Sequence, residues 1–133
     1  YSKWKKIRNM VTELHWKTIS FLIENYDTIL LPDFRVSQMI RKRKLPRITK
    51  RLLCMFSFHS FKEKLIYKCA MYKKKLCIVD ESYTSCTCGV CGMINNVKGS
   101  EIYKCGCGLV IDRDVSGSRN IFIKNTMLRS AEL

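Results

Sequence analysis

The stretches Cys-Thr-Cys-Gly-Val-Cys-Gly at residues 86–92 and Cys-Gly-Cys-Gly at residues 105–108 hold five of the eight cysteines of the chain. A glycine directly follows four of the five, and glycine allows the tight, sometimes left-handed turns that let backbone N–H groups point at sulfur. Zn2+ prefers four thiolates in a tetrahedron, and two short cysteine pairs joined by a hairpin supply them. We therefore predict a structural zinc ribbon whose ligands are Cys88, Cys91, Cys105 and Cys107.

A fifth cysteine, Cys86, is an alternative zinc ligand. Cys86 is followed by Thr87 instead of glycine, but the pair Cys105–Cys107 is one residue shorter than the usual knuckle. Cys86 could therefore substitute for one of the four ligands, and the cysteines could instead form disulfides or stay as buried free thiols. The first residues lack the apolar core of a signal peptide, so we expect an intracellular protein in which clustered cysteines bind metal.

On both sides of the ribbon, the apolar pattern predicts alternating helices and strands. Apolar residues at helical spacing predict helices over residues 3–25 and 52–72, and a third helix beginning near Asp114. Short apolar runs at residues 28–31 and 76–79 predict buried strands. This alternation indicates an α/β fold in which the ribbon is inserted between the second strand and the last helix.

The charge of the chain indicates a polyanionic partner. Lys and Arg number 25 against 11 Asp and Glu, a net charge of +14, and such a surplus is self-repulsive without a polyanion. No apolar run approaches the roughly 20 residues of a membrane span, so we expect nucleic acid and not a membrane. The densest basic run surrounds Pro46, and we predict that it is an exposed loop leading into a helix. Its basic side chains are Arg41, Lys42, Arg43, Lys44, Arg47, Lys50 and Arg51. The alternative is that this run is only a solvated, disordered segment.

Two carboxylates flank the ribbon. Glu81 follows the second predicted strand, and Asp114 begins the last predicted helix. A hairpin module inserted between them should bring its ends together, so we expect the two carboxylates within roughly 8 Å of each other, able to share one Mg2+ or a pair about 4 Å apart. The alternative role for Asp114 is that of a helix N-cap.

Several stretches resemble a known family. The sequences of residues 83–92 and 107–121 resemble the C-terminal signature of the transposon-encoded TnpB nucleases, as do residues 14–17 and 26–34. Relatives of TnpB are the Fanzor proteins of eukaryotes and their large viruses, and the type V CRISPR effectors. The resemblance implies a partial RNase H-like (RuvC) fold with an inserted four-cysteine zinc ribbon. It also implies Mg2+-dependent DNA cleavage directed by a guide RNA, with Asp114 as a metal ligand and Asp112 shaping the turn.

The chain departs from the TnpB pattern at one catalytic position. TnpB proteins carry a glutamate at the end of the strand before the basic loop, and here that position is Pro32. Fanzor proteins often use a glutamate just ahead of the zinc ribbon instead, which corresponds to Glu81. Asp33 is the rival ligand, but on a strand it points to the face opposite residue 32, so Glu81 is favoured.

The resemblance also predicts the organisation of the chain. A RuvC-like core segment should cover residues 1–82, the zinc ribbon residues 83–111, and the final carboxylate with its helix residues 112–133. The first RuvC aspartate of the family lies upstream of such a segment. The isolated chain should therefore be inactive and should need the upstream part of the same protein to complete its site.

The partners follow from the same resemblance. Guide RNA and target DNA are expected, with the basic run on the phosphates of the guide–target duplex, and the Fanzor relatives point to the nucleus. The competing hypothesis is a non-catalytic, zinc-ribbon nucleic-acid-binding protein derived from a transposon, which the loss of the acid at Pro32 favours.

Overall fold

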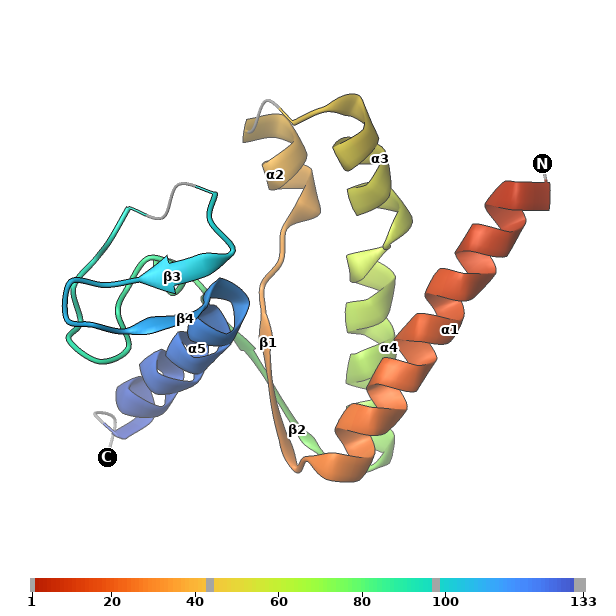
Figure 1. Cartoon of the computed structure of the whole chain (residues 1–133). Coiled ribbons are helices and arrows are strands. Elements are labelled where there is room, and N and C mark those ends of the chain that lie inside the picture. The colour runs from red at the N-terminus through yellow and green to blue at the C-terminus, as the bar shows by residue number, and fades with distance from the viewer. Residues whose placement is uncertain (1, 43–44, 97–98, 131–133) are drawn as a thin grey trace. The chain divides into compact units, whose positions relative to one another are not determined.

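The computed structural model describes residues 2–42, 45–96 and 99–130 of a mixed α/β chain (Figure 1). The chain divides into two compact units. The helical unit comprises residues up to Ile29 and from Phe34 to Cys77, and the ribbon unit comprises Leu30–Asp33 and the residues from Ile78 onward. The elements run in the order α1 (Ser2–Asn25), β1 (Thr28–Pro32), α2 (Val36–Lys42), α3 (Arg47–Met55), α4 (Phe58–Met71), β2 (Lys75–Val79), β3 (Ile102–Lys104), β4 (Val110–Asp112) and α5 (Arg113–Ser130).

The first and last helices lie where the sequence predicts them, but the middle helix does not. The predicted helix over residues 52–72 is interrupted between α3 and α4, so the prediction of one continuous helix was wrong. Ser57 adopts a left-handed conformation with φ of 47°, and its hydroxyl donates to the carbonyls of Cys54 and Met55, both at 3.4 Å. A serine that satisfies nearby carbonyls in this way competes with the helical hydrogen bonds.

The basic run is also more helical than predicted. Arg41 and Lys42 end α2, a helix that the sequence pattern did not predict, and α3 begins at Arg47. The prediction of a loop over the whole run was therefore wrong. The predicted nucleic-acid contacts Arg43 and Lys44 lie outside the described residues.

The two predicted strands pair with each other. Strands β1 and β2 form a two-stranded sheet, each one residue longer than predicted. The backbone N–H of Lys75 donates to the carbonyl of Asp27 at 2.9 Å, and that of Asp33 donates to Val79 at 3.0 Å. The N-terminal ends of the two strands therefore lie side by side, and so do their C-terminal ends, which means that the strands are parallel. Burial is partial, because Val79 is 7% exposed whereas Ile78 is 44% exposed.

The core of the helical unit lies where α1 packs on α4. Its buried side chains are Ile19, Ile23, Leu65 and Cys69. His15 is buried beside them, and its Nε2 lies 2.9 Å from the carbonyl of Phe56. None of the helices in the described residues combines the length and the apolar character that a membrane span needs.

Candidate metal centre

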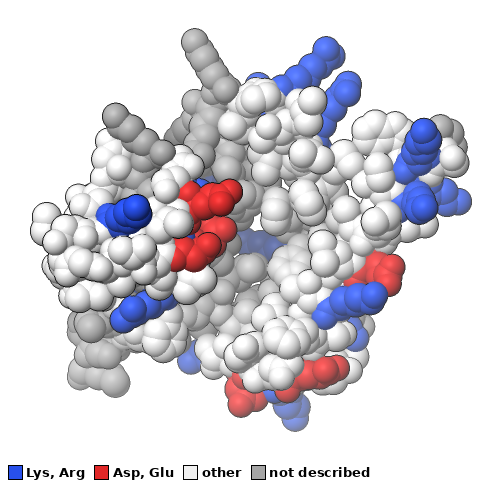
Figure 2. Space-filling view, viewed as in Figure 1, with Lys and Arg blue, Asp and Glu red and all other residues white. Residues whose placement is uncertain are grey.

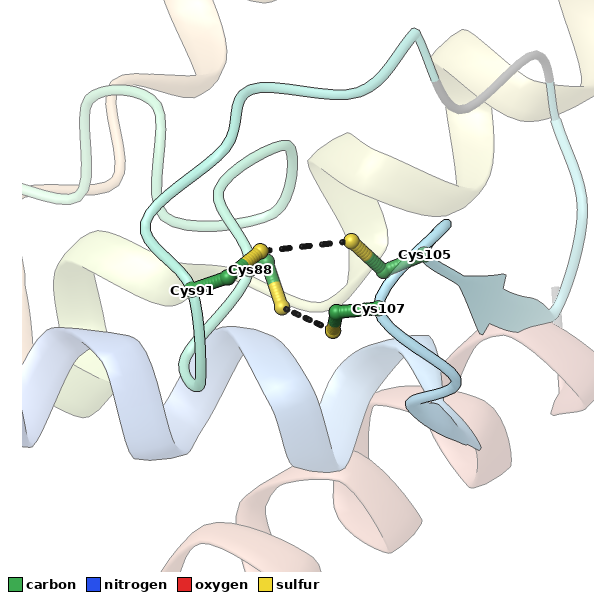
Figure 3. Close-up of side chains that lie close together, drawn as sticks. All are labelled: Cys88, Cys91, Cys105 and Cys107. Carbon is green, nitrogen blue, oxygen red and sulfur yellow. Dashed lines mark hydrogen bonds between the residues drawn. The ribbon is translucent and has the colours of Figure 1, made fainter.

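Four cysteine sulfurs meet in the ribbon unit (Figure 3). The Sγ atoms of Cys88 and Cys107 lie 3.6 Å apart and those of Cys91 and Cys105 lie 3.5 Å apart, and all four lie within 4.8 Å of one another. A tetrahedron with Zn–S bonds of about 2.3 Å has S–S edges of about 3.8 Å. The cluster therefore has the size and donor set of a structural zinc site, and it consists of the four cysteines that the sequence predicts.

The substitute ligand considered above does not join this cluster. The sulfur of Cys86 contacts the hydroxyl of Ser85 at 3.8 Å. The backbone carbonyl of Cys86 accepts hydrogen bonds from the N–H of Asn95 at 2.8 Å and from the hydroxyl of Tyr103 at 3.2 Å. Cys86 therefore braces the first cysteine loop through its backbone, while its thiol stays outside the group of sulfurs.

Two tight loops position the sulfurs. In the first, the N–H of Gly92 donates to the carbonyl of Cys88 at 2.9 Å, and in the second, the N–H of Gly108 donates to Cys105 at 3.0 Å. Strands β3 and β4 carry the second loop as an antiparallel hairpin in which Tyr103 pairs with Ile111. Tyr103 is fully buried, and its hydroxyl bonds to Asn95 and to the carbonyl of Cys86.

Backbone N–H groups approach every sulfur of the cluster, as the glycine pattern predicts. The N–H groups of Cys91 and Val90 lower the pKa of Cys88. The N–H of Cys107 is the main cause that lowers the pKa of Cys105 to about 6. Such hydrogen bonds orient thiolate ligands and stabilise their charge.

The other two thiols have raised pKa values. The N–H of Met93 lowers the pKa of Cys91, but hydrogen bonds with the sulfurs of Cys105 and Cys88 outweigh it and raise that pKa to about 12. The N–H of Leu109 likewise lowers the pKa of Cys107, and the neighbouring sulfurs raise it overall. Four thiols so close together cannot all ionise unless a cation balances their charge, and Zn2+ would supply that charge.

The glycines of the two loops have different roles. Gly92 and Gly108 have φ angles of 74° and 95°, which is the left-handed region that favours glycine. Gly89 is required for a different reason, because a Cβ there would lie 2.7 Å from the side-chain oxygen of Asn120. Gly89 therefore allows the first cysteine loop to approach α5 closely.

Asn120 connects α5 to the ribbon by hydrogen bonds. Its side chain is buried, and its Nδ2 donates to the carbonyls of Thr84 at 2.8 Å and Thr87 at 2.7 Å. One α-helical turn further on, Lys124 binds Asp80 at 2.7 Å and the carbonyl of Ser82 at 3.1 Å. Neither residue was predicted from the sequence, although an asparagine in mid-helix is a signal that a polar partner lies beside it.

The N-terminus of α5 is capped by Asp112 and not by Asp114. The Oδ1 of Asp112 accepts the N–H groups of Asp114 at 2.9 Å and Val115 at 3.1 Å. The alternative role of Asp114 as the N-cap was therefore wrong. The carboxylate of Asp114 lies exposed on the first turn of α5, where the helix dipole favours negative charge. On the visible face, acidic side chains gather near β3, β4 and this turn (Figure 2).

Glu81 lies in the turn that follows β2. Its side chain is exposed, and its carbonyl accepts the N–H and the hydroxyl of Thr84 at 3.2 and 2.7 Å. The residues on either side of it contact Lys124, ten residues beyond Asp114. A helix rises about 1.5 Å per residue, so these two helix positions are about 15 Å apart, and the long lysine side chain spans part of that length. The segment that holds Glu81 is thus tied to α5 through Lys124, and a carboxylate separation within roughly 8 Å stays a prediction.

The rival carboxylate and the basic run complete the set of predicted residues. Asp33 is half-buried, directly after β1. In the basic run, the side chain of Lys50 is half-buried. Those of Arg41, Arg47 and Arg51 are exposed. The side chains of Lys42, Arg43 and Lys44 lie outside the described part of the chain.

The chain is similar to one family model and to several known proteins. Residues 58–121 match the family model described as Cas12f1-like, TNB domain. The chain is 38% identical to a putative transposase of Paramecium bursaria Chlorella virus 1 over 116 residues, which are 83% of the chain and 25% of that protein. It is 30% identical to a TnpB-like protein of Acanthamoeba polyphaga mimivirus over 120 residues, 88% of the chain and 23% of that protein.

A bacterial relative carries a more specific name. The chain is 28% identical over 131 residues to a putative RNA-guided DNA endonuclease of Streptomyces pristinaespiralis, covering 88% of the chain and 32% of that protein. The chain thus spans about a quarter of the length of the viral relatives and about a third of the bacterial one.

Proposed function

The chain belongs to the TnpB/Cas12f-like family, whose C-terminal TNB (zinc-finger) region it carries, and from this we propose that it is the C-terminal nuclease segment of an RNA-guided, metal-dependent DNA endonuclease. The observation that carries the proposal is the continuous match over residues 58–121. These residues include α4, β2, the cysteine cluster and the start of α5, so the match covers both ends of the ribbon and both proposed catalytic carboxylates.

The proposed chemistry is hydrolysis of a phosphodiester by Mg2+ in a RuvC-type site. Glu81 and Asp114 are exposed carboxylates on the two chain segments that enter and leave the ribbon, and carboxylate oxygens are the ligands that Mg2+ prefers. Glu81 and Asp114 would hold Mg2+ between them, either as one shared ion or as a pair about 4 Å apart, and the metal would supply the charge that stabilises the transition state. Pro32 contributes no ligand, and Asp33 has the lesser role.

An upstream segment of the same protein is proposed to complete the fold and the site. Helix α1 leaves Trp4, Met10 and Leu14 more than half exposed, and α3 has no buried residue although one of its faces is apolar. Apolar surface of this kind is typical of a face that packs against further chain. Sequencing the coding region upstream tests the proposal, because a strand ending in Asp-x-Gly would supply the third metal ligand. Its absence would favour a non-catalytic nucleic-acid-binding protein.

Guide RNA and target DNA are the proposed partners, and the basic run is their proposed contact. Replacing Arg41, Lys42, Arg43 and Lys44 by alanine should weaken binding to all nucleic-acid sequences alike. Each lost phosphate contact should flatten the plot of log affinity against log salt by about 0.9 for a duplex. Fluorescence anisotropy at several salt concentrations measures this slope.

The matched control removes the same charge elsewhere. Lys3, Lys5, Lys6 and Arg8 on α1 are exposed, and their replacement by alanine should change the slope less. An equal change in both variants would mean that only the net charge acts, and that the basic run makes no direct contact.

A further inference from the structure

A second cationic surface lies on the helical unit, where α1 packs on α4. The ammonium groups of Lys64 and Lys68 lie 5.4 and 5.8 Å from the centre of the Trp16 ring, and that of Lys68 lies 5.4 Å from the centre of the Tyr72 ring. Lys64, Lys68 and Tyr72 follow one another at intervals of four residues, so they form one stripe along the helix and its C-terminal end. Lys64, Lys68, Tyr72 and Trp16 are called the Trp16 surface below.

The contacts hold the two ammonium groups in place. Both lysines are half-buried, with their ammonium groups over the aromatic rings. His15 also fixes Lys64. Its Nε2 lies 2.9 Å from the carbonyl of Phe56, which requires a proton on that nitrogen, and this leaves Nδ1 to accept from Lys64 at 3.5 Å. Burial lowers the pKa of His15, which keeps the ring in this neutral form.

No acidic partner neutralises this pair within the described part of the chain. The carboxylates nearest in sequence are engaged elsewhere, since Glu13 binds Lys17 at 2.7 Å and Glu63 binds His59 at 3.3 Å. Two like charges fixed on one indole repel each other, and an anion placed between them removes that repulsion. The geometry therefore favours a ligand that brings negative charge.

Exposed aromatic rings beside the two lysines indicate which kind of anion this surface binds. Tyr72 is 54% exposed, Tyr67 on the preceding turn is 60% exposed and Trp16 is 37% exposed. Exposed aromatic rings interleaved with lysines form a stacking platform for unpaired bases, while the ammonium groups follow the phosphates. In a duplex the bases are already stacked and paired, so aromatic rings offer it little.

We propose that the Trp16 surface binds single-stranded nucleic acid, through phosphates on Lys64 and Lys68 and bases on the exposed rings. This rests on the proposed function only in that nucleic acid is the partner. It adds a contact on α1 and α4. This contact uses other residues than the basic run of α2 and α3 and other residues than the carboxylates of the ribbon unit.

Binding of oligothymidylate to the zinc-loaded chain tests the surface. Lys64→Gln with Lys68→Gln should weaken binding about tenfold or more, because both phosphate contacts and the platform geometry are lost. Lys3→Gln with Lys5→Gln removes the same charge from the exposed start of α1 and should weaken binding less than about threefold. Circular dichroism of each variant checks that the helices are intact.

Tryptophan emission gives a second readout that does not depend on charge. The chain has two tryptophans, so Trp4→Phe leaves Trp16 as the only reporter and Trp16→Phe leaves Trp4. Oligothymidylate should quench the first variant strongly and the second weakly.

The outcomes separate this proposal from the proposed function. Equal weakening in the two lysine pairs, with binding itself retained, would refute the Trp16 surface and leave the nuclease proposal intact. Equal loss of duplex and single-strand binding in the Lys64/Lys68 variant would refute the single-strand assignment. If neither strand form binds the unmodified chain, both proposals lose their nucleic-acid partner.

Discussion

Replacing Cys107 by serine is expected to unfold the ribbon and to abolish zinc binding. Cys107 supplies one of four sulfurs that lie within 4.8 Å of one another, and a three-sulfur remnant is a much poorer site for Zn2+. Binding of structural zinc contributes roughly 10–16 kcal/mol in zinc-finger peptides, as much as the whole stability of a typical domain. Elemental analysis of the purified chain should give about one zinc for the unmodified protein and close to none for the variant.

Cys86→Ser is the matched control, because Cys86 lies in the same loop but outside the cluster. This variant should keep its zinc and the dispersed amide NMR signals of residues 84–112. Unmodified chain without zinc but with a folded ribbon would contradict the metal assignment. Loss of zinc in Cys86→Ser would contradict the assigned ligand set.

The effect should extend from the ribbon to α5. Asn120 is held by the carbonyls of Thr84 and Thr87, and Gly89 packs directly against it. Without a folded ribbon these partners lose their positions, and the first turn of α5, which carries Asp114, loses its support. In the longer protein, Cys107→Ser should therefore also abolish DNA cleavage, whereas Cys86→Ser should not.

Glu81→Ala and Asp114→Ala are expected to reduce cleavage by the longer, RNA-loaded protein by roughly a thousandfold or more. Each of the two carboxylates would hold Mg2+, which would stabilise the charge that develops during hydrolysis, and each variant would remove one of these ligands. Affinity for target DNA should stay nearly unchanged, because the basic residues that are proposed to contact phosphates are untouched. Cleavage on a gel and binding by anisotropy measure the two effects separately.

Two neighbouring aspartates serve as controls. Asp33→Ala removes the rival carboxylate and should change cleavage far less. Asp112→Ala removes the cap of α5 and should cost about 1 kcal/mol of stability, with a modest loss of activity. Strong loss in Asp33→Ala together with normal cleavage in Glu81→Ala would transfer the ligand role from Glu81 to Asp33.

The local features of the fold could be predicted from the sequence. The four cysteines of the cluster could be predicted from the Cys–Gly pairs, because a cysteine loop is closed by hydrogen bonds within a few residues, such as that from Gly92 to Cys88. Helix α1 and the start of α5 likewise depend on apolar spacing and a nearby cap.

The features that were missed depend on single conformations or on distant contacts. The break at Ser57 rests on one left-handed residue, which the apolar spacing on either side does not reveal. The contacts of Asn120 and Lys124 with the segment around the start of the ribbon were also missed, because their partners lie 33 to 44 residues away in the sequence. Inserting a hairpin brings its ends near each other, but the register against α5 decides how near.

Cleavage by the longer protein tests the central claim most directly. The protein is purified with its bound guide RNA and incubated with DNA complementary to that RNA, in the presence of Mg2+ or EDTA. We predict cleavage with Mg2+, none with EDTA, and none with Asp114→Ala although that variant still binds the DNA. Tight DNA binding by the unmodified protein, with no cleavage in Mg2+, would contradict this claim and would identify a binding protein instead of a nuclease.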